Sequence, residues 1–127
     1  MLENPTVIIV DELFAGLDEN IKKYLSKLFQ KLKTKYNKTI IIGSMDVDFL
    51  YQNTENIILL DNIIRVGKTQ DVFEDVPFLI ENDIEVPKLP LFTYLTVKYK
   101  RTKLSYHKDI RDLIKDIYKH IDFSEKK

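Results

Sequence analysis

The N-terminal part of the chain alternates between short, unbroken apolar runs and one long periodic stretch. Residues 6–10 and 39–42 are continuous and rich in β-branched side chains, which is typical of parallel strands buried on both faces. Between them, apolar positions recur at helical spacing from residue 18 to about residue 36, and Asp18 is placed to cap that helix. This order predicts two parallel strands joined by a helix.

Shorter elements are predicted in the middle of the chain. A short helix is expected over residues 46–52. Two apolar runs, 56–60 and 63–66, flank Asp61 and Asn62, which favours a hairpin with a tight turn. The alternation of strands and helices up to this point predicts an α/β fold with a parallel sheet.

The rest of the chain changes to a helical pattern. We expect a helix over residues 71–80 that is broken at Pro77, and a stiff connection over 87–90. Further helices are predicted over 91–100 and 109–121, the last with a regular apolar stripe. The C-terminal part is therefore predicted to be a helical extension.

Composition and charge narrow the function classes. The 127 residues carry 20 basic and 20 acidic side chains and no cysteine. Zero net charge gives no general electrostatic reason to expect a nucleic-acid partner, and the lack of cysteine excludes disulfides and thiolate chemistry. No apolar run approaches the roughly 20 residues of a membrane span, so we expect a cytoplasmic protein. Its glycines, Gly16, Gly43 and Gly67, are too scattered for a glycine-rich phosphate loop.

An acidic pair follows the first predicted strand. Asp11 and Glu12 would lie at the carboxyl end of a parallel sheet, where α/β proteins bind their ligands. An aspartate there suits magnesium, commonly through water, and a neighbouring glutamate can orient an attacking water. Acidic residues also end many strands simply by being solvated or by capping a helix, so the pair alone leaves the choice open.

Several motifs in the correct order resemble the C-terminal half of an ABC transporter ATP-binding subunit. Residues 7–12 are similar to its Walker B strand, and residues 15–18, Ala-Gly-Leu-Asp, match its D-loop. Residues 39–46 resemble the strand that leads to its switch histidine. The segments 57–66 and 67–73 are similar to the hairpin that closes the domain and its continuation.

This resemblance implies a fold and roles for particular residues. The fold would be the C-terminal half of a P-loop ATPase domain that uses Mg²⁺ and ATP. Asp11 would be the metal ligand, Glu12 the general base and Asp18 the residue that communicates across the ATPase dimer. Met45 takes the place of the switch histidine, and its thioether offers no hydrogen-bond donor. The two histidines, His107 and His120, lie in the C-terminal extension and are not expected to replace it.

The C-terminal extension suggests a subgroup and its partners. Residues 1–75 would form the partial ATPase domain. Residues 76–127 are similar to the extension of energy-coupling-factor ATPases, which drive uptake of vitamins and transition-metal ions. In that group the extension helps to pair two ATPase subunits. The implied partners are a second ATPase subunit or an N-terminal half, and a membrane-embedded transport component, with the chain peripheral on the inner face of the membrane and no nucleic acid bound.

The phosphate loop, the Q-loop and the LSGGQ signature are not expected within this chain, because only ten residues precede Asp11. The sequence Gly67-Lys68-Thr69 imitates the end of a phosphate loop, but Asn62 stands where the first glycine is required. We therefore expect Lys68 to lie at the end of a strand, and the chain alone to be inactive.

Three interpretations remain open on sequence grounds. The chain can be the C-terminal half of an uptake ATPase, a non-catalytic interaction or dimerisation module derived from one, or a decayed gene product that folds poorly alone. A phosphoryl-accepting receiver domain also has an acidic strand end. It fits less well, because a receiver needs acidic residues earlier in the chain and only Glu3 precedes the first strand.

Overall fold

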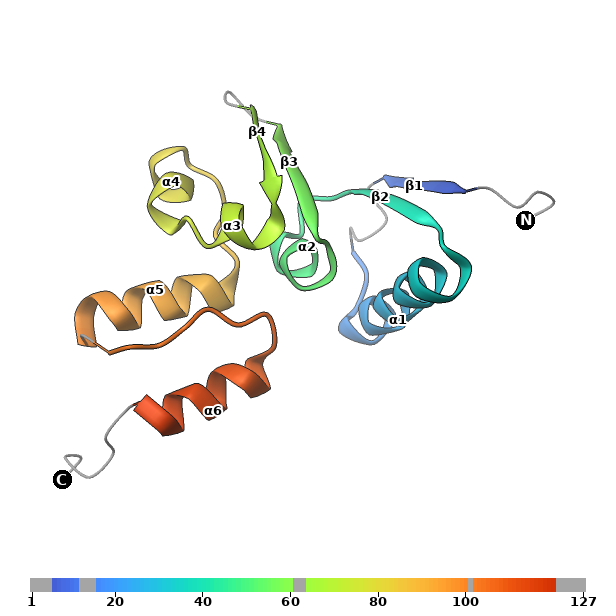
Figure 1. Ribbon diagram of the computed structural model, residues 1–127. Helices are drawn as coiled ribbons and strands as arrows, with labels where there is room; N and C mark the ends of the chain where they lie inside the picture. The colour runs from blue at the N-terminus through green and yellow to red at the C-terminus, as the bar shows by residue number, and fades with distance from the viewer. Residues whose placement is uncertain (1–5, 12–15, 61–63, 101, 121–127) are drawn as a thin grey trace. The chain divides into compact units, whose positions relative to one another are not determined.

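A computed structural model describes residues 6–11, 16–60, 64–100 and 102–120. The chain divides into two compact units, residues 1–49 and residues 50–127. Figure 1 labels the helices and strands of both units. The predicted boundary at residue 75, between a partial ATPase domain and a C-terminal extension, is not tested by this division and stays a prediction.

The first unit contains the predicted parallel strand pair. Strand β1 (Val7–Asp11) pairs with β2 (Thr39–Gly43), and the helix α1 (Glu19–Tyr36) connects them (Figure 1). The register runs from Val7 opposite Thr39 to Asp11 opposite Gly43. The sequence prediction of strand, helix and parallel strand is confirmed.

Both ends of α1 follow from local chemistry. The Ile21 backbone N–H donates a hydrogen bond of 2.9 Å to the Asp18 carboxylate, so Asp18 is the predicted N-cap. At the other end Asn37 has a φ of 51°, a left-handed conformation that asparagine tolerates and that stops a helix.

One face of the β1–β2 pair is open. The side chains of Val7, Ile9 and Ile41 are exposed, Ile9 to 72%. The prediction that these strands are buried on both faces is therefore wrong for the chain as it stands. The alternating residues of each strand are half-buried, and α1 contacts β2.

The second unit is built around an antiparallel hairpin. Helix α2 (Val47–Asn53) begins at the end of the first unit and leads to β3 (Asn56–Leu60). Strand β3 pairs with β4 (Ile64–Lys68), with Ile58 opposite Val66. This confirms the predicted hairpin, while its turn lies outside the described residues.

The predicted helix over residues 71–80 is two helices, α3 (Thr69–Phe73) and α4 (Val76–Glu81). The break does not fall at Pro77, which lies in the first turn of α4, where a proline needs no backbone donor. It falls just before, because the Asp75 carboxylate caps α4 by accepting from the Phe78 N–H.

Helix α5 (Lys88–Lys100) begins three residues earlier than predicted. The expected stiff connection over 87–90 is instead mostly the first turn of this helix. Pro90 is the third helical residue, and the first residues of a helix have no partner inside it for their N–H groups. A proline is therefore tolerated there. The last helix, α6 (Ile110–His120), agrees with the prediction as far as the structure describes it.

The core of the second unit gathers apolar side chains from its helices and hairpin. The Tyr51 and Phe73 rings meet edge to face with centroids 6.3 Å apart. The buried apolar residues of this unit are Leu50, Tyr51, Ile57, Val72, Phe73, Val76, Leu79, Leu104 and Leu113. Across the described parts of the chain, no helix is both long and apolar enough to traverse a bilayer.

Candidate functional site

The carboxyl ends of β1 and β2 bring Asp11 beside Gly43. The two residues are direct partners in the parallel register. A Cβ atom at position 43 would lie only 2.7 Å from Asp11 Oδ1, closer than such atoms approach in proteins. The carboxylate thus occupies space that only a glycine leaves open, and Asp11 is exposed to solvent.

This arrangement suits the predicted metal chemistry. A carboxylate at a sheet edge can hold hydrated Mg²⁺, which usually keeps several waters and one or two protein ligands. The described residues contain no group of three or more histidine or acidic side chains placed to hold a metal ion. A magnesium ion at Asp11 would therefore need further ligands from water and nucleotide phosphates.

The other two predicted acidic residues, Glu12 and Asp18, are not seen beside Asp11 among the described residues. Glu12 lies outside the described residues. The Asp18 carboxylate caps α1, and Gly16, two residues earlier, has a φ of 75°, which favours glycine. Both belong to the first unit, as does Asp11.

Met45 stands in the turn after β2 and is 88% exposed. The turn itself is held by hydrogen bonds on either side of it. The Asp46 N–H donates to Ser44 Oγ at 3.0 Å, and the Phe49 N–H donates to Asp46 Oδ1 at 3.1 Å. The thioether at position 45 is therefore presented to solvent by a locally ordered turn.

An ion pair that the sequence pattern did not reveal ties this turn to α1. Lys22 Nζ lies 2.7 Å from Asp46 Oδ2. The hydrogen bond to Asp46 is the main cause that raises the pKa of Lys22. The capping pattern of Asp46 is visible in the sequence, but nothing in the spacing links it to a lysine on the preceding helix.

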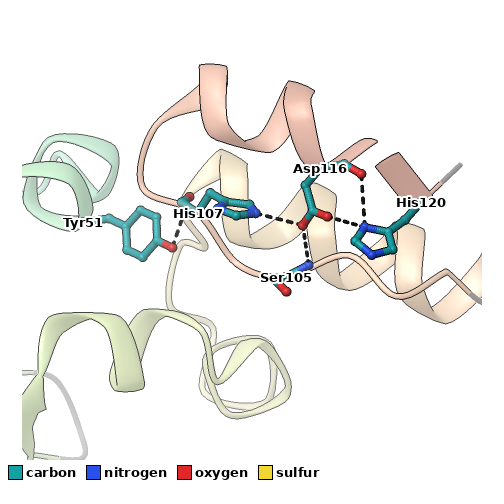
Figure 2. Close-up of polar contacts among 5 residues, drawn as sticks. All are labelled: Tyr51, Ser105, His107, Asp116 and His120. Atoms are coloured by element: carbon teal, nitrogen blue, oxygen red, sulfur yellow. Dashed lines mark hydrogen bonds and ion pairs between the residues drawn. The ribbon is translucent and has the colours of Figure 1, made fainter. Parts of the chain in front are cut away.

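A second polar cluster lies in the C-terminal unit, where Figure 2 shows Asp116 between two histidines. Asp116 Oδ2 is 2.8 Å from His107 Nε2 and accepts a 2.8 Å hydrogen bond from the Ser105 N–H. Its Oδ1 contacts His120 Nδ1. Because an ionised carboxylate only accepts, each histidine presents an N–H to it.

These contacts make Asp116 a structural acid. The hydrogen bond from His107 is the largest of the causes that lower the pKa of Asp116 to about 2, and the Ser105 N–H adds to it. The carboxylate is buried in the structure and joins the irregular segment before α6 to α6 itself. The side chains of His107 and His120 are 26% and 33% exposed.

Tyr51 extends this cluster into the core. Its hydroxyl donates to Glu74 Oε1 at 3.0 Å. The same hydroxyl lies 3.4 Å from the His107 carbonyl oxygen, as Figure 2 shows. Burial raises the pKa of Tyr51 and is also the main cause that raises the pKa of Glu74. The arrangement is a part-buried hydrogen-bond network, and we assign it a structural role.

The phosphate-loop imitation is part of the hairpin. Gly67 is paired with Ile57 across the sheet, and Lys68 is the last residue of β4. Thr69 is fully buried, and its hydroxyl lies 2.9 Å from the Thr54 hydroxyl. These residues occupy a strand and its junction with α3, as expected from Asn62 in place of the required glycine.

No family model matches the chain, but curated proteins do. It is 35% identical to the energy-coupling factor transporter ATP-binding protein EcfA2 of Mycoplasma mobile over 125 residues, which is 97% of the chain and 40% of that protein. It is 32% identical over 85 residues to EcfA2 of Enterococcus faecalis, covering 65% of the chain and 29% of that protein. It is 37% identical over 86 residues to EcfA of Malacoplasma penetrans, covering 66% of the chain and 30% of that protein.

Proposed function

We propose a function that proceeds from the homology of this chain to the energy-coupling factor transporter ATP-binding proteins, of whose length it spans two-fifths or less. The chain supplies the magnesium-binding and water-activating part of such a subunit, and a separate segment or polypeptide supplies the phosphate loop and signature motif. The assembled subunit couples ATP hydrolysis to uptake across a membrane. The observation that carries this proposal is Asp11, placed over Gly43 at the carboxyl ends of two parallel strands.

Each of the three acidic residues has a distinct role in the proposal. Asp11 holds Mg²⁺ through water, and Glu12 takes the proton of the attacking water. Asp18, in the segment before α1, serves communication across a dimer of ATPase subunits. The ion, when bound, neutralises charge on the nucleotide phosphates and so favours phosphoryl transfer.

The exposed apolar faces of the strands support the proposal that another part of an ATP-binding domain packs on them. On the hairpin, Ile58, Leu60, Ile64 and Val66 are all exposed, and they lie in cross-strand pairs. Together with the open face of β1–β2, this leaves apolar strands uncovered in each unit. Soluble proteins rarely expose contiguous apolar patches of this kind. We propose that the remainder of the ATP-binding domain covers these faces.

Complementation tests this function. The chain is mixed with a polypeptide that carries a phosphate loop and signature motif from one of the matched relatives, and Mg²⁺-dependent ATP hydrolysis is measured. The pair is expected to hydrolyse ATP, while Glu12→Gln reduces the rate by about 10² or more because the general base is lost. Glu81→Gln, a change of the same kind at the exposed end of α4, should leave the rate unchanged. Equal rates for Glu12→Gln and the native chain would exclude the role given to Glu12.

A second candidate function is a non-catalytic interaction or dimerisation module, and Met45 favours it. An exposed thioether cannot donate a hydrogen bond to a γ-phosphate as the switch histidine does. In this case the chain binds a second ATPase subunit and a membrane-embedded component without turning over ATP. Isothermal titration of nucleotide into the reconstituted pair separates the two: binding supports the ATPase role, and no heat of binding supports the module.

The proposed location follows from the same partners. An ATP-binding subunit that works with a membrane-embedded component lies in the cytoplasm, peripheral to the inner face of the membrane. Fractionation of cells that express the chain with its partners is expected to recover it with the membranes.

A further inference from the structure

The charge of the chain is unevenly distributed, and α1 is strongly basic. This helix contains six lysines and a single acidic residue, Glu19, although the chain as a whole has no net charge. Such a concentration on one 18-residue helix creates a local positive surface that the overall composition hides.

Four of these lysines lie on the outer side of α1. Lys23, Lys27, Lys31 and Lys35 follow one another at intervals of four residues, the spacing that places side chains along one side of a helix, and all four are exposed. The opposite side packs inward: Leu25, Phe29 and Leu32 are half-buried, and α1 contacts β2.

The four outer lysines are not neutralised within the described parts of the chain. Lys22 of α1 forms ion pairs with Glu19 and Asp46. No carboxylate among the described residues forms an ion pair with any of the four outer lysines, and Lys35 lies over the Tyr36 ring instead. Their charges are therefore available to an external anion.

Apolar side chains border the basic stripe. Tyr24 is 67% exposed, and Ile21 and Leu28 are also exposed. They lie three and four residues from one another, so they share one flank of the helix beside the lysines. A tyrosine with its polar hydroxyl and apolar ring suits a boundary between water and hydrocarbon.

We propose that the outer side of α1 is a docking surface for a membrane leaflet that contains anionic phospholipids. Lysine ammonium groups on flexible stems attract a field of phosphates without a fixed geometry. The flanking Ile21, Tyr24 and Leu28 contact the interfacial region. Because the other side of α1 packs on β2, the helix binds at the membrane surface and does not insert into the bilayer.

The same charges fit a membrane better than a nucleic acid. The stripe contains no arginine, the side chain most used for bidentate contacts to phosphates and bases. The surface depends on α1 alone and does not require the proposed ATPase role.

Co-sedimentation of the full chain with vesicles tests this surface. Binding is expected to vesicles that contain phosphatidylglycerol and not to pure phosphatidylcholine vesicles, and it should weaken as salt is raised, because surface charge is screened. Changing Lys23, Lys27, Lys31 and Lys35 together to glutamine should lower the partition coefficient by roughly a hundredfold, since each lysine near an anionic surface contributes several-fold.

A matched variant controls for net charge. Lys98, Lys100, Lys103 and Lys119 are exposed lysines of the second unit, and changing these four to glutamine removes the same charge. This variant should keep most of the vesicle binding. Far-UV circular dichroism should show both variants folded like the native chain, since lysine and glutamine have similar helix propensities.

Three outcomes would overturn the proposal. Equal binding to both lipid compositions would assign any association to the open apolar strands. An equal loss in both variants would assign it to net charge alone. Binding of a fluorescent DNA or RNA duplex through the α1 lysines, with no vesicle binding, would assign the surface to nucleic acid. The salt dependence of the native chain needs no variant and so stays informative if a variant unfolds.

Discussion

At the scale of single residues, the position of Asp11 depends on what is absent from its neighbour. Its carboxylate fills the space where a larger residue at position 43 would carry a Cβ atom. The sequence predicted both residues at the strand ends, since apolar runs and their polar endings are local features. It did not predict their contact, because that depends on the register between two strands separated by the length of α1.

Gly43→Ala therefore tests whether the position of the Asp11 carboxylate affects the proposed binding of Mg²⁺. The new Cβ would displace the end of a flexible side chain, so the free energy of unfolding should change by less than about 1 kcal/mol. The Mg²⁺ concentration for half-maximal ATP hydrolysis by the reconstituted pair should rise. Gly67→Ala is the matched control, because its Cβ would meet only Val72 Cγ2 at 3.4 Å. Equal magnesium dependence in the two variants would contradict the proposed role of the Asp11 position.

The Asp116 cluster gives the second unit a defined acid response. The hydrogen bond from His107 lowers the pKa of Asp116 to about 2 in the folded chain, below the value of about 3.9 of a free aspartate. A lowered pKa stabilises the folded state above the unfolded value. This stabilisation is present above about pH 4 and is lost as the pH falls toward 2. Urea unfolding between pH 2 and pH 6 should show the loss, and Asp116→Asn should flatten this part of the profile.

Asp112→Asn is the control for that pH profile. Asp112 is an exposed acidic residue in the first turn of the same helix and has no hydrogen bond to either histidine among the described contacts. Its substitution should leave the acid dependence close to that of the native chain. An unchanged pH profile in Asp116→Asn would contradict the contribution of the Asp116 carboxylate to the free energy of unfolding. The sequence did not reveal this cluster, because Ser105, His107 and Asp116 meet only through a loop that folds back on α6.

At the scale of elements, apolar periodicity located the strands and the long helices, and prolines caused the errors. Pro77 was predicted to break a helix and Pro90 to belong to a stiff connection, although each lies in the first turn of a helix, where its missing N–H has no consequence. The true break before α4 comes from Asp75. Its dual role as a cap and an ion-pair partner is a tertiary feature, because the other partner, Arg65, lies on β4.

Asp75→Ala should destabilise the second unit. Asp75 Oδ1 accepts from the Phe78 N–H, and Oδ2 lies 2.8 Å from Arg65 Nη1, whose guanidinium stacks on the Phe78 ring. Losing the cap alone costs about 1 kcal/mol, and the loss of the partly exposed ion pair adds to this by a smaller amount. Urea unfolding of the full chain measures the difference. Glu81→Ala, at the exposed end of the same helix, should cost clearly less, and an equal cost would contradict the capping role.

At the scale of the whole molecule, the homology and the open strands both support the proposal that another part of an ATP-binding domain covers the exposed strands. The chain matches two-fifths or less of its relatives, and each of its two units leaves apolar strand residues exposed. The unbroken apolar runs of the sequence predicted strands buried on both faces. That pattern is typical of a larger sheet, whereas the described residues form two strands in each unit.

Pairing with the complement should therefore protect these strands. Amide exchange of β1, β2 and the β3–β4 hairpin is expected to slow when the polypeptide with the phosphate loop is added, because their open faces become covered. The N–H groups within α6, which already packs on the second unit through Leu113, should change less. Unchanged strand exchange in a mixture that hydrolyses ATP would place the contact elsewhere on the chain.

The most direct test of the account is a titration of the chain into a fixed amount of the polypeptide with the phosphate loop, with Mg²⁺-dependent ATP hydrolysis as the measurement. We expect hydrolysis to rise with each addition, to reach a plateau at an equimolar ratio, and to be slower by about 10² or more when the added chain carries Glu12→Gln. Hydrolysis that stays at the level of the phosphate-loop polypeptide alone, in a mixture where the two polypeptides co-purify, would contradict the catalytic role and leave the chain as an interaction module.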